Sequence, residues 1–555
     1  MKTRLHFLSF ILLSLLFGFV LGIVYAISLV TGSLTWQIMI MFTVILNFLF
    51  WLINPYISDL IYKFFYKIKF SNIEDYDVKE LENYKYLIFI KKVCSKHNLK
   101  VPKIGIIKDK NPTAFCYGSA SFNARIILTE GLFTFLNEKE LEAVVAHELG
   151  HIVNKDFIIM SLASTFLQIL YEIYVIFSGS RRIKSEDSKG KGSYLVVVGF
   201  ISLLLYFIGT YILLFLSRIR EYYADDFSAK EVGDSNLLSS ALIKIGYGIA
   251  IVPDTVKTSH LLNNTRSLGI FDFKSSKNIG LIYLNGKNDK SFLEKALLFD
   301  IVNPWAKLLE FKSTHPLIGK RIKKLCSLTS SPMFNFDSII NNSNIDKKRL
   351  WGNFFKDILV NNLILFTFII LYLVIFLEIF LKLDYYLITL VIGTILLIFF
   401  SIIKIRYKYP KKEFVETNIL NCMSDIYASP IRGKQVKLRG EAIGRGEAGF
   451  IFSEDMIFQD NSGIIYLNYE SNIPLFGNLF FSWKKLKKLF RKTATSTGWF
   501  LRGNTHHLEL FQFKTSDEVI NSYVRFWLIF GYVFNIVLFE SILILILFLM
   551  RINLF

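Results

Sequence analysis

Residues 147–151 read His-Glu-Leu-Gly-His, a spacing that suits a metal centre. On a helix, His147 and His151 project from one face, one turn apart. Two imidazoles at that separation can bind a single zinc ion and leave room for water and one more protein ligand. Glu148, between them, is well placed to take a proton from that water. The pattern predicts one Zn²⁺ per chain and the chemistry of a zinc peptidase.

A third protein ligand should be a His, Asp or Glu that the fold brings close. The best candidate lies in the segment Arg-Ile-Arg-Glu-Tyr-Tyr-Ala-Asp, residues 218–225. Glu221 is the predicted ligand. Asp225 lies one turn further on the same face and suits a hydrogen bond to a zinc-bound imidazole. Asp225 or Asp226 as the ligand is the open alternative.

The residues before the motif predict where its helix begins. Asn137 can cap the helix, and Glu140 can reach back to complete a capping box. Apolar residues then recur with helical spacing, which predicts one apolar stripe, with the two histidines on a different face. The members of this stripe are Leu141, Val145, Leu149 and Ile152.

Composition indicates a membrane protein. Apolar residues make up 53% of the 555-residue chain, and 54 residues are Phe. The net charge of +19 comes largely from Lys and Arg at the ends of apolar runs, which favours topology control over nucleic-acid binding. The four cysteines suggest no disulfide framework, as expected of domains that face a reducing cytoplasm. The lipid bilayer is thus an expected partner, and nucleic acid is not.

Seven apolar runs are long enough to span a membrane, and we interpret them as three hairpins and a final span. The runs are residues 7–30, 36–53, 157–177, 194–216, 359–381, 385–403 and 527–549. Basic residues after the second and sixth runs predict that the polar domains face the cytoplasm. The net-positive loop 181–191 conflicts with full crossing of the second hairpin, so a hairpin that does not fully cross stays open.

Between these apolar runs the sequence has mixed polarity, as expected of folded domains. Residues 104–107 and 125–129 predict strands, and residues 406–522 contain short strand-like runs between Gly and Asp turns, typical of a small β-barrel or sandwich. We therefore divide the chain into seven parts. They are a hairpin (1–56), a first catalytic part (57–156), a hairpin (157–217), a second catalytic part (218–350), a hairpin (351–405), a β-rich module (406–522) and a final span (523–555).

Three separated motifs resemble the HtpX family of membrane zinc peptidases, to which the CAAX prenyl proteases are related. The resemblance covers roughly residues 1–326. The motifs are Pro-Thr-Ala-Phe-Cys-Tyr-Gly at 112–118, the zinc motif with Glu221, and Ser-Thr-His-Pro-Leu-Ile-Gly-Lys-Arg-Ile at 313–322. Thr113 replaces the family's Asn. The resemblance implies a multi-pass α-helical membrane protein with a mainly helical α+β zincin (gluzincin) catalytic domain, followed here by the β-module.

The resemblance also implies how a substrate is held. An extended peptide can bind an exposed strand edge through main-chain hydrogen bonds. His315 and Arg321 are candidates to stabilise the negative charge that develops on the attacked carbonyl oxygen. A salt bridge is the alternative role for Arg321, and a helix cap is the alternative for His315. The candidate substrate strand consists of Ala114, Phe115, Cys116, Tyr117 and Gly118, and an ordinary interior strand is the alternative for this segment.

The sequence thus predicts a membrane-embedded zinc endopeptidase that cleaves membrane or membrane-associated proteins in protein quality control, in the plasma membrane of a prokaryote. A CAAX-type processing peptidase shares the chemistry and differs in substrate. A scaffold with a structural zinc site is the non-enzymatic alternative, although such a site needs no base at Glu148. Charged residues in 138–142 argue against an intramembrane protease.

Overall fold

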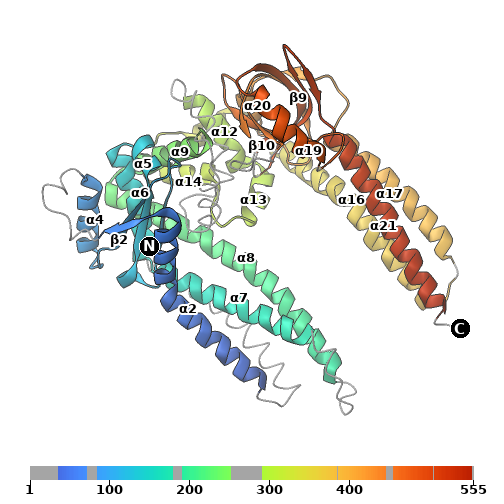
Figure 1. The fold of residues 1–555 in the computed structure, drawn as a ribbon, viewed down its shortest axis with the longest axis horizontal. Helices are drawn as coiled ribbons and strands as arrows, with labels where there is room; N and C mark the ends of the chain where they lie inside the picture. Colours follow the sequence, from blue (N-terminus) through green and yellow to red (C-terminus); the bar gives the residue numbers. More distant parts are fainter. Residues whose placement is uncertain are drawn as a thin grey trace. The chain divides into compact units, whose positions relative to one another are not determined.

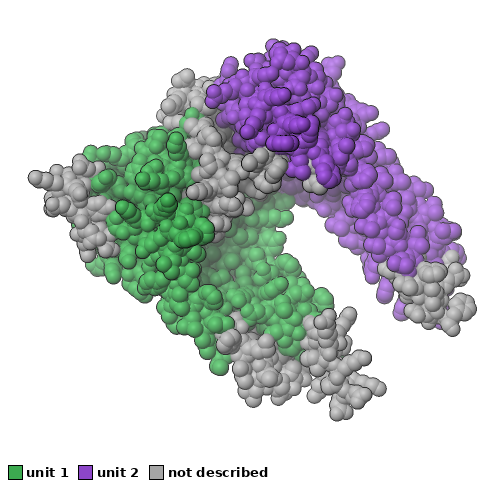
Figure 2. Space-filling view, in the orientation of Figure 1, with its two compact units in different colours: residues 1–252, 260–280, 308–335 green, residues 253–259, 281–307, 336–555 purple. Residues whose placement is uncertain are grey.

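The computed structural model describes eight stretches of the chain, which divide into two compact units (Figure 2). The described residues are 35–71, 84–178, 191–251, 290–383, 385–445, 454–474, 476–503 and 506–552. Unit 1 comprises residues 1–252, 260–280 and 308–335, and unit 2 comprises 253–259, 281–307 and 336–555. Each unit has long apolar helices and a sheet. The predicted span at 7–30 and most of the positive loop 181–191 lie outside the described residues.

Unit 1 contains a four-stranded sheet in the order β1-β2-β4-β3. Its strand β2 is labelled in Figure 1. Its strands are β1 (Lys69–Ser71), β2 (Lys103–Ile107), β3 (Ala114–Tyr117) and β4 (Arg125–Thr129). The predicted strands at 104–107 and 125–129 are confirmed as β2 and β4, which pair in parallel. β3 pairs antiparallel with β4 and stands at one end of this order.

The central helix of unit 1 is α6 (Glu138–Val153), which carries the His-Glu-Leu-Gly-His motif. The predicted capping box is confirmed: the Glu140 N–H donates to Asn137 Oδ1 at 2.9 Å, and the Asn137 N–H donates to Glu140 Oε2 at 2.9 Å. The four residues of the predicted apolar stripe are buried, and so is every other residue from 140 to 152. The reason is tertiary: α6 contacts other elements on all sides. These are α4 (Lys85–Lys96), α7 (Asp156–Ser178), α8 (Lys191–Val232), α9 (Ser235–Ile251) and β3.

Helices α7 and α8 pack against each other and form the predicted second hairpin. Both are long and apolar enough to cross a membrane, as is α2 (Thr35–Tyr66), which contacts α7. With 42 residues, α8 is about 63 Å long, roughly twice the ~30 Å hydrocarbon core. The span and the predicted ligand segment are therefore one continuous helix, whose last turns extend beyond the bilayer alongside α6.

The shorter helices complete both units. Those around the unit 1 sheet are η2 (Ser121–Asn123), α5 (Glu130–Phe135) and α14 (Ile318–Cys326). Those that lead into or belong to unit 2 are α12 (Lys290–Val302), α13 (Pro304–Phe311), α15 (Phe336–Asn342), α18 (Ile419–Met423), α19 (Phe476–Phe480), η4 (Phe481–Lys485) and α20 (Leu486–Leu489).

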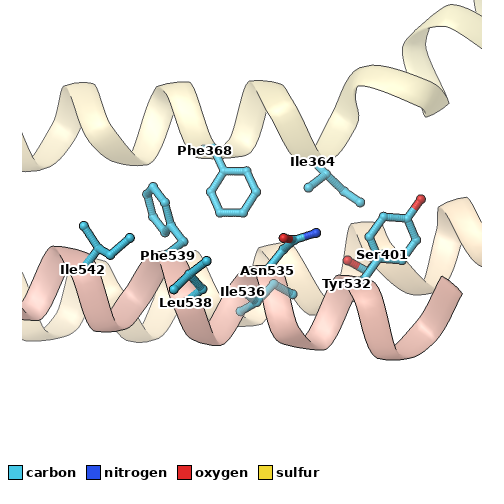
Figure 3. Close-up of a pocket in the computed structure, with 9 residues that line it drawn as sticks. All are labelled: Ile364, Phe368, Ser401, Tyr532, Asn535, Ile536, Leu538, Phe539 and Ile542. Atoms are coloured by element: carbon cyan, nitrogen blue, oxygen red, sulfur yellow. The ribbon is translucent and has the colours of Figure 1, made fainter. Parts of the chain in front are cut away.

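Unit 2 contains three further candidate membrane helices, which bring the total within the described residues to six. They are α16 (Lys347–Phe380), α17 (Tyr386–Lys408) and α21 (Val524–Ile552). They share a buried apolar cluster, and a cavity of about 350 Å³ lies between them (Figure 3). Glu540, an ionisable group within a span, faces α17 and accepts a hydrogen bond from Thr394.

The predicted β-module of unit 2 is confirmed as a closed barrel. Five strands form a ring in the order β6-β7-β8-β10-β9-β6, with β8 and β10 parallel and the other pairs antiparallel. This is the connectivity of an OB-fold, with α19, η4 and α20 between β8 and β9. The ring strands are β6 (Lys434–Arg445), β7 (Met456–Gln459), β8 (Ile464–Asn468), β9 (Thr493–Arg502) and β10 (His506–Thr515). The short strands β5 (Val415–Glu416) and β11 (Val519–Asn521) add to β6 and β10.

Candidate metal centre

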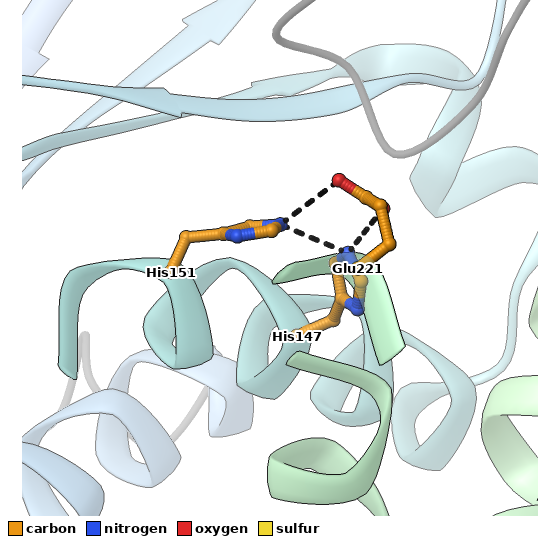
Figure 4. A group of neighbouring side chains, drawn as sticks. All are labelled: His147, His151 and Glu221. Carbon is orange, nitrogen blue, oxygen red and sulfur yellow. Dashed lines mark hydrogen bonds and ion pairs between the residues drawn. The ribbon is translucent and has the colours of Figure 1, made fainter. Parts of the chain in front are cut away.

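The fold brings together the two histidines of α6 and one carboxylate of α8 (Figure 4). His147 Nε2 lies 3.2 Å from His151 Nε2 and 3.4 Å from Glu221 Oε2. His151 Nε2 lies 3.5 Å from Glu221 Oε1. All three side chains are buried. Among the described residues, this is the one group of His, Cys, Asp and Glu side chains with the proximity needed to hold a metal ion.

The separations match what a zinc ion requires. Bonds of about 2.0–2.2 Å in a tetrahedral arrangement hold neighbouring ligand atoms about 3.3–3.6 Å apart. The two Nε2 atoms are 3.2 Å apart, and each lies 3.4–3.5 Å from one oxygen of the Glu221 carboxylate. Glu221 Oε2 and both carboxylate oxygens of Glu148 are buried and make no hydrogen bond within the described residues. Buried acceptors need a partner, and a cation with a water molecule would satisfy these three. The residues therefore fit a zinc ion.

The Nδ1 atom of each imidazole lies close to a carboxylate oxygen. His147 Nδ1 lies 3.0 Å from Asp225 Oδ1, and His151 Nδ1 lies 2.6 Å from Asp156 Oδ2. Such contacts fix the ring orientation and direct Nε2 toward the metal. Asp225 was predicted in this position. Asp156 was missed, although its signal was present in the sequence as an acidic residue five positions after His151, at the first position of an apolar helix.

The sequence Arg-Ile-Arg-Glu on α8 supplies three different contacts. Arg218 donates to the carbonyl oxygens of Glu310 (2.9 Å) and Ser313 (2.7 Å), which holds the segment that leads to His315. Arg220 Nε lies 3.1 Å from Asp156 Oδ2. Glu221 reaches the histidines. One helix turn thus carries the third candidate ligand and also holds Asp156 and the segment that leads to His315.

Close approach of α6 and α8 depends on Gly150. A Cβ atom at this position would lie 3.0 Å from Ala224 Cα and 3.3 Å from Ala224 Cβ. The absence of a side chain allows the helices to meet where Glu221 must reach the histidines. Ser228, further along α8, donates to the Ala143 carbonyl oxygen at 2.6 Å and fixes the same contact.

The surroundings of the site shift the pKa of the candidate base and of one candidate ligand. Burial raises the pKa of Glu148, which brings a carboxylate closer to the range useful for a general base at neutral pH. For His147, burial disfavours the charged form, but contacts with Asp225 and Glu221 outweigh it and raise its pKa to about 9. The same negative surroundings would favour a bound dication.

His315 and Arg321 also lie at the site. His315 Nε2 is 3.6 Å from Glu221 Oε1, and its side chain is buried. Arg321 donates to both Asp225 oxygens, at 2.9 and 2.6 Å, and its NH1 lies 3.6 Å from Glu221 Oε2. The salt bridge considered for Arg321 is therefore present, and a catalytic role for either residue stays a prediction. Asp226, the alternative ligand, is not part of the three-residue cluster.

The candidate substrate strand lies against the motif helix. β3 contacts α6, and Cys116 Sγ donates to the Glu148 carbonyl oxygen at 3.5 Å. The strand Ala114–Tyr117 is buried, with Gly118 directly after it. At the neighbouring position, the Thr113 N–H donates to Thr129 Oγ1 at 2.8 Å. β3 is thus beside the candidate base, at one end of the sheet order.

Asp156→Asn is expected to weaken zinc binding by roughly 10–100-fold, because a carboxamide supports the imidazole of His151 less strongly than a carboxylate. The measurement is zinc affinity by competition with a chromogenic chelator. Glu231→Gln is a matched control, since Glu231 Oε1 lies 2.9 Å from His97 Nε2 in a His–carboxylate contact unrelated to the site. Equal affinities of the two variants would contradict the role assigned to Asp156.

The sequence around this site is similar to that of known peptidases. Residues 86–329 match the family described as Peptidase family M48. A protease HtpX homolog from Methanothermobacter thermautotrophicus is 33% identical over 228 residues, which cover 40% of this chain and 80% of that protein. The chain belongs to peptidase family M48.

One further relative and one solved structure are also similar to this chain. A protease HtpX homolog from Thermoplasma acidophilum is 27% identical over 320 residues, which cover 57% of this chain and 93% of that protein. The crystal structure of S. mikatae Ste24p is 19% identical and covers 58% of this chain and 67% of that one, with a TM-score of 0.31. The prediction of an HtpX-like family is confirmed. With six candidate membrane helices, the protein is an integral membrane metallopeptidase.

Proposed function

We propose that the protein is a zinc-dependent endopeptidase that cleaves membrane or membrane-associated proteins as part of protein quality control. The observation that carries the proposal is the buried His147–His151–Glu221 cluster beside Glu148, whose carboxylate oxygens make no hydrogen bond within the described residues. A structural zinc site needs no such base. The continuous helix α8, which joins a span to the site, supports a substrate at the membrane surface.

In this proposal His147, His151 and Glu221 hold one zinc ion within a gluzincin domain. The ion would lower the pKa of a bound water to about 7 and polarise the scissile carbonyl group. Glu148 accepts a proton from the attacking water and returns it to the leaving amine. His315 and Arg321 stabilise the negative charge on the carbonyl oxygen. Asp156 and Asp225 keep the two imidazoles oriented.

Residues 114–118 are the proposed substrate strand. The position of β3 at the end of the sheet order, with Cys116 against the backbone of Glu148, supports an extended peptide that runs past the base. The catalytic domain faces the cytoplasm of a prokaryote's plasma membrane in this proposal. Three lysines that follow the second apolar run, in the last turn of α2 and just after it, support that orientation. They are Lys63, Lys67 and Lys69.

The proposed substrate class can be tested with purified protein in lipid nanodiscs. Zinc-loaded protein is expected to cleave an unmodified membrane-protein substrate at internal bonds, observed by mass spectrometry of the products. Removal of metal with 1,10-phenanthroline should abolish cleavage, and added zinc should restore it. Cleavage confined to a prenylated C-terminal peptide would favour the CAAX-type alternative. Zinc binding with no cleavage of either substrate would favour the scaffold.

A further inference from the structure

A second cavity of unit 2, of about 560 Å³, lies where α16 begins, α17 ends and the chain enters the barrel. Its lining is strongly basic. Five cationic side chains and one carboxylate line it: Arg349, Arg406, Lys412, Arg432, Lys434 and Asp425. A cavity with this excess of positive charge favours an anionic ligand.

Two of the five cations are partly neutralised. Lys434 Nζ lies 2.6 Å from Asp425 Oδ2, and Arg432 NH1 lies 3.7 Å from Asp357 Oδ1. Within the described part of the chain, the other three form no ion pair with a carboxylate. These three are Arg349, Arg406 and Lys412, contributed by α16, by α17 and by the segment after α17. All three side chains are exposed and line the same cavity, so their charges are available to a phosphate group.

The walls of this basic cavity are fixed by buried contacts. Asp357, fully buried on α16, accepts hydrogen bonds from Trp305 Nε1 (2.9 Å) and from the Tyr407 hydroxyl. The Arg349 guanidinium lies 4.5 Å from the centre of the Tyr427 ring. At Gly433, a Cβ atom would lie 2.2 Å from the Lys408 carbonyl oxygen, so only glycine allows the loop to approach the end of α17. The cavity is therefore organised before any ligand binds.

The depth of the cavity matches the headgroup region of a bilayer. α17 has 23 residues and is about 34 Å long, slightly more than the ~30 Å hydrocarbon core. Arg406 and Tyr407 lie in its last turn and thus at the level of lipid phosphates. Arg349 and Asn353 lie in the first two turns of α16, before its long apolar run begins at residue 359.

An apolar stripe continues from Arg406 into the membrane. Residues four apart on a helix lie above one another, so Ile402 and Ile398 extend the face of Arg406 toward the middle of α17. Both side chains are exposed, as is Ile395 one turn further. A ligand with a phosphate group and an acyl chain can contact the cations and this stripe together. A free phosphate or a nucleic acid has nothing to match the stripe.

We propose that this basic cavity binds the phosphate of an anionic phospholipid from the leaflet that borders the barrel. Arg349, Arg406 and Lys412 contact the phosphate, and the exposed face of α17 contacts an acyl chain. Binding here holds the barrel against the membrane surface. The proposal does not depend on peptidase activity, because every residue involved lies in unit 2.

The test measures lipid binding to the full-length protein by native mass spectrometry in detergent. Dioleoylphosphatidylglycerol is the anionic probe and dioleoylphosphatidylcholine the zwitterionic one. The wild type is expected to retain the anionic lipid selectively. Arg349→Gln/Arg406→Gln should weaken its binding by roughly 20-fold, since each cation near a membrane surface contributes roughly fivefold to the affinity. The charge-preserving variant Arg349→Lys/Arg406→Lys should retain most of the binding.

Lys347→Gln/Lys348→Gln is the control, because it also removes two positive charges, both from the first turn of α16 beside Arg349 but outside the cavity. It should change the affinity less than twofold. If both glutamine variants lose the same lipid affinity, the effect comes from the overall charge and not from the cavity, and the proposal is overturned. Equal retention of both lipids would overturn it too. So would displacement of the lipid by inorganic phosphate, or by a single-stranded RNA oligonucleotide, at a comparable concentration.

Discussion

Glu148→Gln is expected to lower kcat for peptide cleavage by roughly 10²–10⁴-fold, while the zinc content remains that of the wild type. The carboxamide has the shape of the carboxylate but cannot accept a proton from water. Neither carboxylate oxygen of Glu148 makes a hydrogen bond within the described residues, so the substitution removes no internal hydrogen bond. The measurements are turnover of a quenched fluorescent peptide and metal content by mass spectrometry of the purified protein.

A control on the same helix separates this effect from a general change in charge. Glu142 lies six residues before Glu148 and forms an ion pair with Lys139 at 2.7 Å, away from the candidate metal centre. Glu142→Gln should retain nearly full turnover, because it changes no group of the candidate metal centre and the partner in its ion pair, Lys139, is exposed. Equal turnover by wild type and Glu148→Gln would remove Glu148 from the mechanism, whatever the metal content.

Features set by short sequence separations were predictable. The capping box of Asn137 and Glu140 follows from a three-residue spacing, and the shared face of His147 and His151 from a four-residue spacing. Glu221 could be predicted as the third ligand because α7 and α8 form a hairpin, which returns the chain to α6. The closed barrel was predictable as a module from alternation and turn residues. Its ring closure was not, because β8 and β10 pair across more than thirty residues.

The other features of the fold and of the site depend on tertiary contacts that one sequence does not reveal. Apolar periodicity predicted a stripe on α6, but the charged residues Glu140 and Glu142 are buried as well. Glu140 is compensated by Lys244 of α9, whose Nζ lies 2.6 Å from its carboxylate. Asp156 and Arg220 flank spans, where charged residues usually indicate topology. Their contact with each other behind His151 becomes visible only once α7 and α8 are side by side.

Glu221→Gln is expected to reduce zinc affinity by at least about 100-fold and to abolish cleavage, because it leaves two imidazoles and a neutral carboxamide as ligands. Arg321 NH1, 3.6 Å from Glu221 Oε2, would then face the site with less opposing charge, which disfavours a cation further. The measurement is zinc stoichiometry after dialysis at a fixed free zinc concentration, with affinity obtained by chelator competition.

The comparison between the two Glu→Gln variants decides the assignment. The chemical change is the same, both side chains are buried, and both lie beside His147 and His151. A ligand and a base nonetheless respond differently: Glu221→Gln should lose metal and activity together, whereas Glu148→Gln should lose activity alone. Asp226→Asn tests the alternative carboxylate and should keep its zinc. If Glu221→Gln retains zinc and Asp226→Asn loses it, the third ligand is Asp226 and not Glu221. A carboxylate that binds the ion cannot be removed without lowering the affinity for zinc.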